Sequence, residues 1–520
     1  MQKLPIGIYT FSEIITEGYY YVDKTYYIYQ LAQAGKYYFL SRPRRFGKSL
    51  FLDTLKCAFE GREELFKGLY LENNWDFEKA YPVLCFSLGR GRVSSLEELN
   101  TNILSMLDAQ AEKQGIECKN ELVANRFAEL IQKVYAKTGR RVVILIDEYD
   151  KPILDNLEDG QKAEQMRDGL MNFYSVIKDS DCYIEFCFIT GVSKFSRVSI
   201  FSDLNNLEDI SLDSRMGAIC GYTQSELENT FAERLPGVDL DELATWYNGY
   251  NFMGEENVYN PFDVLLFFRE NKFGNYWFET ATPSFLVKLL RRNKIYLPNL
   301  EHIEIDQNML SSFDLEQILP EAILFQSGYL TIKNVEEMAP GQRLLTLDFP
   351  NREVRVSLNM HLLNYLSGAP SRTSSLRFRM IKALQQQDMQ QVKKLFQSLF
   401  SSIPYEWYTQ SRMDEYEGYY ASVVYAFLAS LGVDLHPEPS SNHGQADLII
   451  DSKEVVYILE FKVVELVGDG QKAITQIKEK GYHQQYVQAG RKVILLGMDF
   501  SKQERNIAGF EFEWINFEEI

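Results

Sequence analysis

The sequence of 520 residues predicts an α/β protein organised around a parallel sheet. Two apolar runs, residues 37–40 and 141–146, are typical of strands buried on both faces, because they do not alternate polar with apolar residues. Between them, residues 95–138 are expected to be helical, because Leu96, Leu99, Ile103 and Leu107 recur at spacings of three or four residues. Strand, helix and strand in this order indicate right-handed βαβ units with parallel strands.

The composition restricts the class of protein. With 45% hydrophobic residues, the chain suits two to four globular domains. Its net charge of -19 provides no global basic field, so any contact with nucleic acid must be local. The cysteines form no C-x-x-C pair, which favours reduced thiols. The first 24 residues lack the pattern of a signal peptide, and no apolar run approaches the roughly 20 residues that a membrane span needs. These observations predict a soluble cytoplasmic protein without membrane contact.

The segment 41–49, Ser-Arg-Pro-Arg-Arg-Phe-Gly-Lys-Ser, follows the first strand and precedes a helix-like stretch. This layout is typical of a nucleotide phosphate loop, in which backbone N–H groups at a helix N-terminus bind phosphate. Lys48 suits the terminal phosphates and Ser49 the magnesium ion. The usual pattern has glycine five residues before Gly47, where this chain has Arg42. Taken alone, the segment fits a basic turn before a helix equally well.

A second set of polar residues follows the later strands. Asp147 and Glu148 end the run 141–146, where Asp147 would hold magnesium through water and Glu148 would orient the attacking water. Thr190 lies at the carboxyl end of the predicted strand 182–191, where related ATPases place a sensor of the terminal phosphate; the alternative is a hydroxyl that caps a turn. The alternative for the acids is a solvated strand end. The candidate nucleotide-binding residues are Arg45, Gly47, Lys48, Ser49, Asp147 and Thr190, with Ser49 and Asp147 as metal ligands and Glu148 as the catalytic residue.

These motifs resemble the bacterial AAA-ATPase-like family. The stretches that carry the resemblance are Tyr-Val-Asp-Lys-Thr at 21–25, Arg-Pro-Arg-Arg-Phe-Gly-Lys-Ser at 42–49, Leu-Ile-Asp-Glu-Tyr-Asp at 145–150, Thr-Gly-Val-Ser-Lys-Phe at 190–195, Trp-Tyr-Asn-Gly-Tyr at 246–250 and Tyr-Asn-Pro-Phe at 259–262. Arg42-Pro43 is the ordinary form of the loop in that family. The resemblance implies ATP and Mg²⁺ as cofactors, a helical lid on the nucleotide domain, and a position beside the nucleotide base for the segment around 21–25.

A second candidate site lies near the C-terminus. Glu460 and Lys462 stand two apart in an apolar strand and therefore project from one face. A two-residue loop at 452–453 would pair Asp447 with Ile458 across a hairpin. Asp447 would then share the face of Glu460, one diagonal away at roughly 7–8 Å. A loop one residue longer would turn Asp447 to the other face.

Two carboxylates beside a lysine suit a magnesium site, in which the acids bind the cation and the lysine holds or activates water. Asp447 with Glu460-Phe461-Lys462 also resembles the PD-(D/E)XK nuclease core, and this resemblance extends to Glu417 and Gln476 in flanking helices. Gln445 departs from the commoner Gly-Arg-x-Asp, which removes no metal ligand. The bland alternative is a solvated hairpin edge. Asp447, Glu460 and Lys462 are the candidate catalytic residues, the two acids also being metal ligands.

Together the two sites predict an ATP-binding and ATP-hydrolysing protein that controls a metal-dependent nuclease domain. The alternative is a regulatory NTPase switch with an inactive nuclease-like binding domain; the intact acids favour the first and the net acidity the second. Nucleic acid is the expected partner, and a homo-oligomer is possible. The expected domains are an ATPase-like domain at 1–215, a helical lid at 216–295, a connecting region at 296–380 and a restriction-endonuclease-like α/β domain at 381–520.

Overall fold

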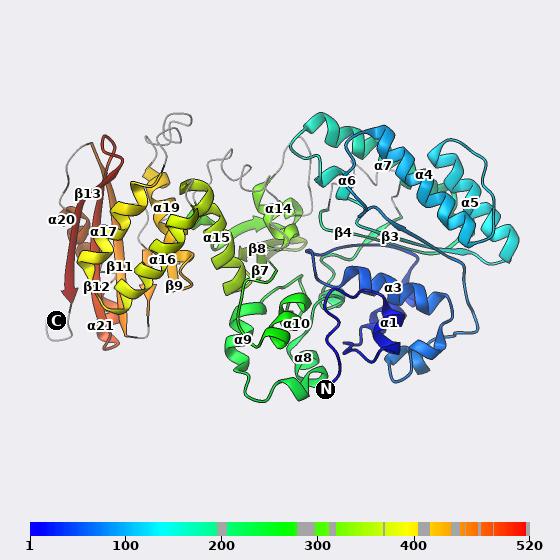
Figure 1. Ribbon diagram of the computed structural model, residues 1–520, viewed down its shortest axis with the longest axis horizontal. Helices are drawn as coiled ribbons and strands as arrows, with labels where there is room; N and C mark the ends of the chain where they lie inside the picture. Colours follow the sequence, from blue (N-terminus) through cyan, green and yellow to red (C-terminus); the bar gives the residue numbers. More distant parts are fainter. Residues whose placement is uncertain are drawn as a thin grey trace. The chain divides into compact units, whose positions relative to one another are not determined.

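The computed structural model describes most of the chain. The described residues are 1–194, 204, 206–277, 297–310, 319–367, 370–403, 417–437, 448–452, 454–465, 468, 470–481 and 483–515. The chain divides into two compact units, of which the first comprises Met1–Phe285 and Glu304–Asn351 and the second Leu286–Ile303 and Arg352–Ile520 (Figure 1). Of the helices that are described, none combines the length and the apolar character that a bilayer crossing needs.

The first unit contains a five-stranded parallel sheet in the order β2-β3-β4-β1-β5. Its strands are β1 Tyr37–Ser41, β2 Val83–Ser87, β3 Val142–Asp147, β4 Ile184–Gly191 and β5 Glu208–Asp209. β1 is buried throughout, as the absence of polar alternation in its sequence predicts. The predicted α/β class with a parallel sheet is confirmed.

The helices of this unit begin and end at recognisable residues. They include α1 Phe11–Thr16, α2 Thr25–Ala34, α3 Lys48–Phe59, α4 Leu96–Lys113, α5 Val123–Thr138, α6 Lys151–Leu154 and α7 Gly160–Asp179. The predicted helical region 95–138 is two helices, since α4 is followed by Gly115 in the left-handed region at φ 63°. At the start of α4, the Ser95 hydroxyl accepts a hydrogen bond from the Glu98 N–H and caps the helix.

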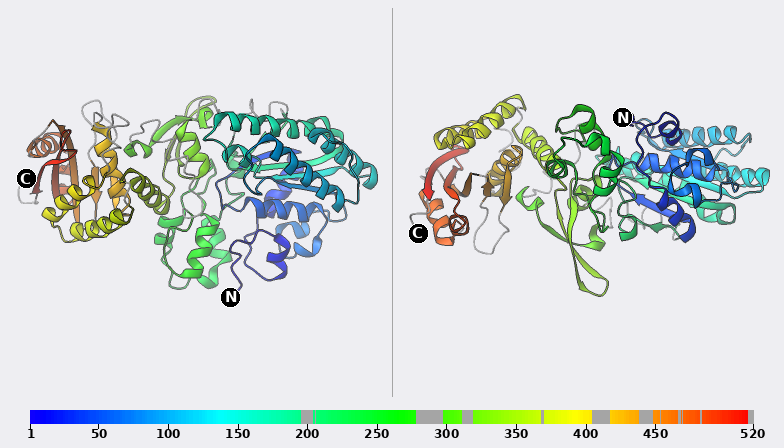
Figure 2. Two further views of the ribbon diagram at one scale, coloured as in Figure 1. Left: turned by 45° about the horizontal axis from the view of Figure 1, so that its top comes forward. Right: turned by 90° about the horizontal axis from the view of Figure 1, so that it is seen from below.

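A helical group follows the sheet: α8 Gln224–Thr230, α9 Leu240–Tyr247 and α10 Pro261–Glu270. These helices share a buried aromatic and aliphatic cluster with Tyr20 and Val22 of the N-terminal segment. Beyond them lie α13 Gln307–Leu310, α14 Pro320–Ser327 and a three-stranded sheet of β6 Ile303–Asp306, β8 Gln342–Asp348 and β7 Thr331–Ala339. The β7–β8 hairpin extends away from the rest of the first unit (Figure 2).

The second unit contains a mixed sheet in the order β13-β12-β11-β10-β9, in which only β11 and β12 are parallel. Its strands are β9 Asp434–Pro437, β10 Leu448–Asp451, β11 Val455–Val464, β12 Lys492–Ser501 and β13 Asn506–Ile515, and its helices are α15 Arg352–Ser367, α16 Pro370–Gln385, α17 Met389–Phe400, α19 Glu417–Ala429, α20 Gln471–Lys480 and α21 Gln484–Gln488. α20 packs on the face of β11 that carries Ile458. The other face carries Tyr457, whose hydroxyl donates to the Leu384 carbonyl of α16.

One strand-like run is a helix. Residues 353–358 alternate apolar with polar side chains and read as a short strand, whereas the structure places them in the first turns of α15. Ser357 and Asn359 are fully buried polar residues of this helix, so polar side chains occupy buried positions between the apolar ones. A helix buried on several sides has no clean period of 3.6 residues, so its sequence can show the alternation that is typical of a strand.

Candidate functional site

The predicted phosphate loop joins β1 to α3 through two left-handed residues. Arg45 has φ 68° and Gly47 has φ 93°, and Gly47 is the N-cap of α3. Left-handed geometry suits glycine and is uncommon for arginine, so the loop is curled tightly before the helix. Within the described part of the chain, no side chain caps α3. Its first backbone N–H groups are therefore available to an anion.

Lys48 is held against the loop that precedes it. Its ammonium group donates to the carbonyl oxygens of Arg42 and Pro43, each at 2.9 Å, and the residue is buried. Burial lowers the pKa of Lys48, an effect that the nearby Asp147 carboxylate opposes. The Arg42-Pro43 pair thus positions the lysine through two carbonyl groups, a role for which the missing N–H of proline is irrelevant.

Arg42 replaces the expected glycine with a buried anchor. Its guanidinium donates to the carbonyls of Ser41 at 2.9 Å, Ser211 at 2.8 Å and Met216 at 3.0 Å. It also lies over the Phe252 ring at 4.1 Å. Burial lowers the pKa of Arg42 to about 10. The loop is therefore tied to the segment 211–216, a contact that sequence spacing does not reveal.

Three predicted residues from three different elements meet at Asp147. The Ser49 hydroxyl of α3 donates to Asp147 Oδ2 at 2.6 Å, and the Thr190 hydroxyl of β4 donates to Asp147 Oδ1 at 2.7 Å. Hydroxyl and carboxylate oxygens are ligands that Mg²⁺ prefers. In the described part of the chain, no group of three or more His, Cys, Asp or Glu side chains is placed to hold a metal. Such a site suits a magnesium ion that nucleotide phosphates also coordinate.

Glu148 faces a cavity of about 560 Å³ in the first unit, which Gly47, Lys48 and Ser49 also line. Its backbone is left-handed at φ 53°, a conformation that costs a non-glycine residue about 1–3 kcal/mol and often occurs at functional sites. A Cβ at Gly89 would lie 2.3 Å from Glu148 Oε2. Gly89 therefore makes room for the carboxylate, and the sequence analysis did not identify it.

Asp150 fixes the chain just after Thr190. Its carboxylate accepts hydrogen bonds from the backbone N–H groups of Val192 at 3.1 Å and Ser193 at 2.6 Å. Burial raises the pKa of Asp150 to about 6, and the two N–H donors partly offset this. In the stretch 145–150, Asp150 therefore has a structural role, next to the candidate site residues Asp147 and Glu148. Phe195, which ends the stretch 190–195, lies outside the described residues.

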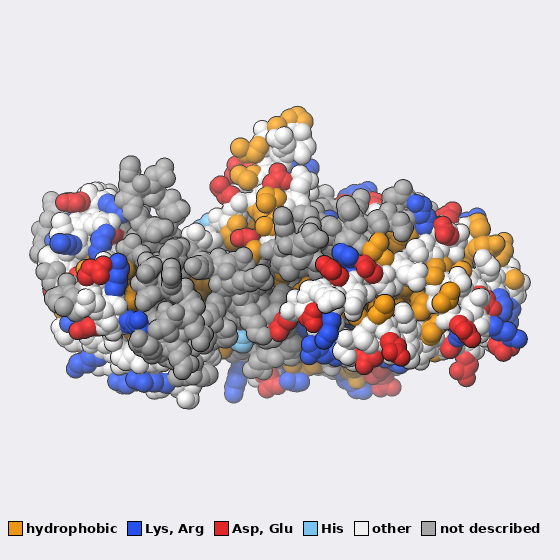
Figure 3. Space-filling view, turned by 90° about the horizontal axis from the view of Figure 1, so that it is seen from above, with side chains coloured by type: hydrophobic (Ala, Val, Ile, Leu, Met, Phe, Trp, Pro, Cys, Tyr) orange, Lys and Arg blue, Asp and Glu red, His pale blue; other side chains and the backbone are white. Residues whose placement is uncertain are grey.

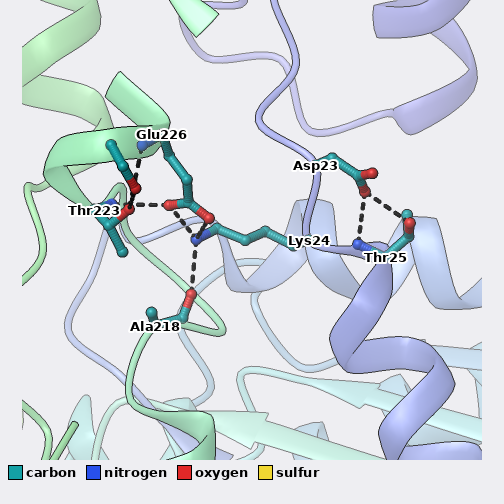
Figure 4. Close-up of polar contacts among 7 residues, drawn as sticks. Asp23, Lys24, Thr25, Ala218, Thr223 and Glu226 are labelled. Carbon is teal, nitrogen blue, oxygen red and sulfur yellow. Dashed lines mark hydrogen bonds and ion pairs between the residues drawn. The ribbon is translucent and has the colours of Figure 1, made fainter. Parts of the chain in front are cut away.

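Lys24 connects the N-terminal segment to the helical group (Figure 4). It lines the cavity, and its ammonium group donates to the Ala218 carbonyl at 2.8 Å and to Glu226 at 2.6 Å. Glu226 also accepts from the Thr223 N–H at 2.8 Å, completing the capping box of α8. Burial lowers the pKa of Lys24 and Glu226 opposes this. Lys24 and Glu226 are 202 residues apart in the chain, so sequence spacing does not reveal this contact.

We expect Glu226→Ala to destabilise the first unit by about 3 kcal/mol, because it leaves the Lys24 ammonium buried without a carboxylate. Thr223→Ala, which removes only the cap, should cost about 1 kcal/mol. Glu228→Ala changes an exposed glutamate of the same helix and is the matched control. Urea unfolding of the three variants measures the order of these effects, and equal stability of the Glu226 and Glu228 variants would refute the importance of the ion pair.

The second unit brings three predicted residues together. Glu460 and Lys462 share one face of β11, with Lys462 Nζ 3.3 Å from Glu460 Oε1. Lys462 Nζ also donates to the side-chain oxygen of Gln476 in α20. Glu460 is fully buried, whereas the Lys462 side chain is 34% exposed. Asp447 lies outside the described residues, as does the side chain of Glu417.

The hairpin register differs from the predicted one. Ile458 pairs with Ile449, and Asp451 pairs with Val456, so the predicted pairing of Asp447 with Ile458 is wrong. The pairing continues to Ser452, whose backbone N–H and hydroxyl both donate to the Val455 carbonyl, so the turn begins one residue later than predicted. The register moves by two residues rather than one. A shift of two keeps each side chain on its predicted face.

Asp499 is a further acid that the sequence analysis did not identify. It pairs with Lys462 in the parallel ladder of β11 and β12, and so shares the face of Glu460. Its Oδ2 accepts from the Gly470 N–H at 2.8 Å at the start of α20. Among the residues that the structure describes, its buried Oδ1 has no hydrogen-bond partner. Asp499 directly follows the run 493–498, which has no polar side chain, just as Asp147 directly follows an apolar run.

Fold and site together define a phosphate-loop α/β unit joined to a nuclease-like unit, and the comparisons with known proteins agree. Residues 5–201 match the family described as "Predicted AAA-ATPase", and residues 415–510 match the PD-(D/E)XK nuclease superfamily. A protein of Azotobacter chroococcum mcd 1, described as "Uncharacterized protein in vnfD 5'region", is 48% identical over 514 residues, covering 98% of this chain and 99% of the relative. No solved structure matches the chain.

The chain therefore belongs to the family of predicted AAA-ATPases that carry a C-terminal domain of the PD-(D/E)XK nuclease superfamily.

Proposed function

We propose that the first unit binds and hydrolyses ATP, and that its nucleotide state controls phosphodiester cleavage in nucleic acid by the second unit. The observation that carries the first half is the meeting of Ser49, Asp147 and Thr190 next to the uncapped start of α3. Lys48 lines the adjoining cavity with Glu148. A hydroxyl, a carboxylate, a lysine and free N–H groups are the groups that a magnesium nucleotide requires.

Each residue has a separate role in this proposal. Lys48 binds the terminal phosphates, while Ser49 and Asp147 hold the magnesium ion, which neutralises phosphate charge when bound. Glu148 orients and polarises the attacking water. Thr190 holds Asp147 in place through its hydroxyl. Arg45, whose guanidinium lies 4.9 Å over the Phe262 ring at the cavity wall, is the further cation of the loop.

We expect Glu148→Gln to keep ATP affinity within about twofold and to lower the hydrolysis rate by about 100-fold or more, since general-base groups contribute about 10²–10⁴-fold. Calorimetry gives the affinity and phosphate release gives the rate. Glu164→Gln, an exposed glutamate of α7, is the matched control. An unaltered hydrolysis rate in Glu148→Gln would take the water-orienting role from this residue.

In the second unit, Glu460 with Asp447 would hold a divalent cation, which would polarise the scissile phosphate, and Lys462 would position the attacking water. The contact of Lys462 with both Glu460 and Gln476 supports this assignment. Asp499 stabilises the start of α20, and through it the position of Gln476. Glu460, Lys462 and Asp499 share one face of the neighbouring strands β11 and β12.

The second candidate function is a regulatory NTPase whose C-terminal unit binds nucleic acid without cutting it. The full burial of Glu460 favours this alternative, because a metal ligand must reach its ion. Cleavage of labelled duplex DNA, single-stranded DNA and RNA with magnesium or manganese distinguishes the two. Cutting that Glu460→Gln abolishes supports the nuclease, and the absence of cutting with retained binding supports the switch.

A further inference from the structure

We propose that the outer face of α16, extended by two lysines of α17, binds the phosphate backbone of nucleic acid. This basic face consists of Arg372, Arg379, Lys382, Lys393 and Lys394. The inference rests on the proposed function, since it names the surface by which the nuclease-like unit engages its substrate.

The local charge is opposite to that of the chain. The net charge of the protein is -19. Between positions 370 and 403, the only acidic residue is Asp388. The basic residues of this segment are Arg372, Arg377, Arg379, Lys382, Lys393 and Lys394. Figure 3 shows Lys and Arg side chains gathered along the edge of the second unit that α16 and α17 form. A concentrated basic surface on an acidic protein is the electrostatic footprint of a phosphate-binding site.

The helix geometry places these side chains together in solvent. Arg372, Arg379 and Lys382 are spaced by seven and three residues, which puts them on one face of α16. All three are exposed, whereas Leu376 and Met380, which flank this face on the helix, are buried. None of the five basic-face residues forms an ion pair or hydrogen bond through its side chain within the described chain. Their charges are therefore free for an external anion.

Arg377 of the same helix, unlike the residues of the basic face, has a structural role. Its guanidinium donates to the Ser430 carbonyl after α19, with Nε at 3.1 Å, and burial lowers the pKa of Arg377. This contact fixes α16 against the core of the unit. On the other side of the hairpin, α17 buries Leu395 and Phe396. The basic face is thus carried on a rigid support, which reduces the entropy lost when it binds a partner.

An exposed aromatic side chain favours nucleic acid over an anionic membrane. Phe378 is 71% exposed and directly precedes Arg379. A base can stack on such a ring, which contributes about 1–3 kcal/mol in single-strand binders. Membrane-bound helices instead present a broad apolar face, and the apolar side of α16 is buried in the unit. A single exposed phenylalanine beside exposed arginine and lysine side chains therefore fits a nucleic-acid strand better than a membrane surface.

The basic face lies away from the candidate metal ligands. α16 contacts the face of β11 that carries Tyr457, whereas Glu460 and Lys462 share the other face with α20. The basic face therefore anchors the substrate at a second point and takes no part in cleavage. We expect its loss to weaken binding and raise KM while leaving kcat nearly unchanged.

The test measures anisotropy of fluorescein-labelled duplex DNA, single-stranded DNA and RNA in EDTA, where no metal supports cleavage. Combined Arg372→Glu, Arg379→Glu and Lys382→Glu should lower affinity about 10-fold or more near 100 mM salt, and should make the slope of log K against log salt shallower by about 2–3. The control carries the same charge change in the first unit, at the exposed residues Lys67, Lys178 and Arg343. Circular dichroism and thermal unfolding check the fold of each variant.

Two further variants keep the proposal falsifiable if the triple variant does not fold. Lys393→Glu with Lys394→Glu on α17 should weaken all three probes, and Phe378→Ala should weaken the single strands more than the duplex. Unchanged affinity in these variants, equal loss in the control, or wild-type binding to phosphatidylserine vesicles but to no nucleic acid would overturn the proposal. Binding that depends on the basic face without any cleavage by the wild type would remove the nuclease function and leave this surface standing.

Discussion

ATP binding falls about 100-fold or more in Lys48→Ala, since the substitution removes the cation expected on the terminal phosphates and charge-assisted hydrogen bonds contribute about 1.5–3 kcal/mol each. The structure adds a second reason. The lysine holds the carbonyls of Arg42 and Pro43 together, so its loss also releases the loop that leads into α3. Titration calorimetry with ATP and magnesium measures the effect.

Lys56→Ala is the matched control for this experiment. Lys56 lies on the same helix and pairs with Asp53 at 2.9 Å outside the cavity lining. The burial of Lys48 is itself unfavourable for its charge, as its lowered pKa shows, so we expect the apo protein to remain folded in Lys48→Ala. Equal ATP affinity in Lys48→Ala and wild type would refute the nucleotide site.

Nucleic-acid cleavage is lost in Glu460→Gln, the second large effect. The substitution removes a carboxylate charge from the candidate metal site and weakens the partner of Lys462. We expect a loss beyond the roughly 10–100-fold that is typical of residues behind a metal ligand. Glu513→Gln, which changes a partly exposed acid of β13 paired with Lys478, is the control. The assay follows cutting of labelled nucleic acid with magnesium or manganese.

Nucleic-acid binding in EDTA should be unchanged in Glu460→Gln, because the basic face of α16 and α17 is intact. Cleavage at the wild-type rate in Glu460→Gln would contradict the assignment of the second site. A variant that neither binds nor cuts would point to misfolding instead, and circular dichroism identifies that case.

The sequence predicts the sheet of the first unit and its polar edge because both rest on local patterns. Uninterrupted apolar runs predict buried parallel strands, and acids at the ends of such strands meet at one edge of the sheet. Ser49, Asp147 and Thr190 come together for this reason. The position of Glu460 and Lys462 on one face follows in the same way from the period of a strand.

Contacts between distant segments escape the sequence analysis. Nothing in the spacing reveals that Arg42 binds the carbonyls of Ser211 and Met216, or that Lys24 pairs with Glu226. The basic face was missed for a different reason. A net charge of -19 averages over the whole chain and hides a short segment of opposite sign, whose exposure only the helix geometry reveals.

The most direct test of the central claim is cleavage of labelled duplex DNA, single-stranded DNA and RNA, with and without ATP, by wild type, Lys48→Ala and Glu460→Gln. We expect metal-dependent cutting of at least one substrate by wild type, a rate that changes when ATP is added, no response to ATP in Lys48→Ala, and no cutting by Glu460→Gln. Cutting that is identical with and without ATP, or the same ATP response in Lys48→Ala, would contradict nucleotide control of the nuclease.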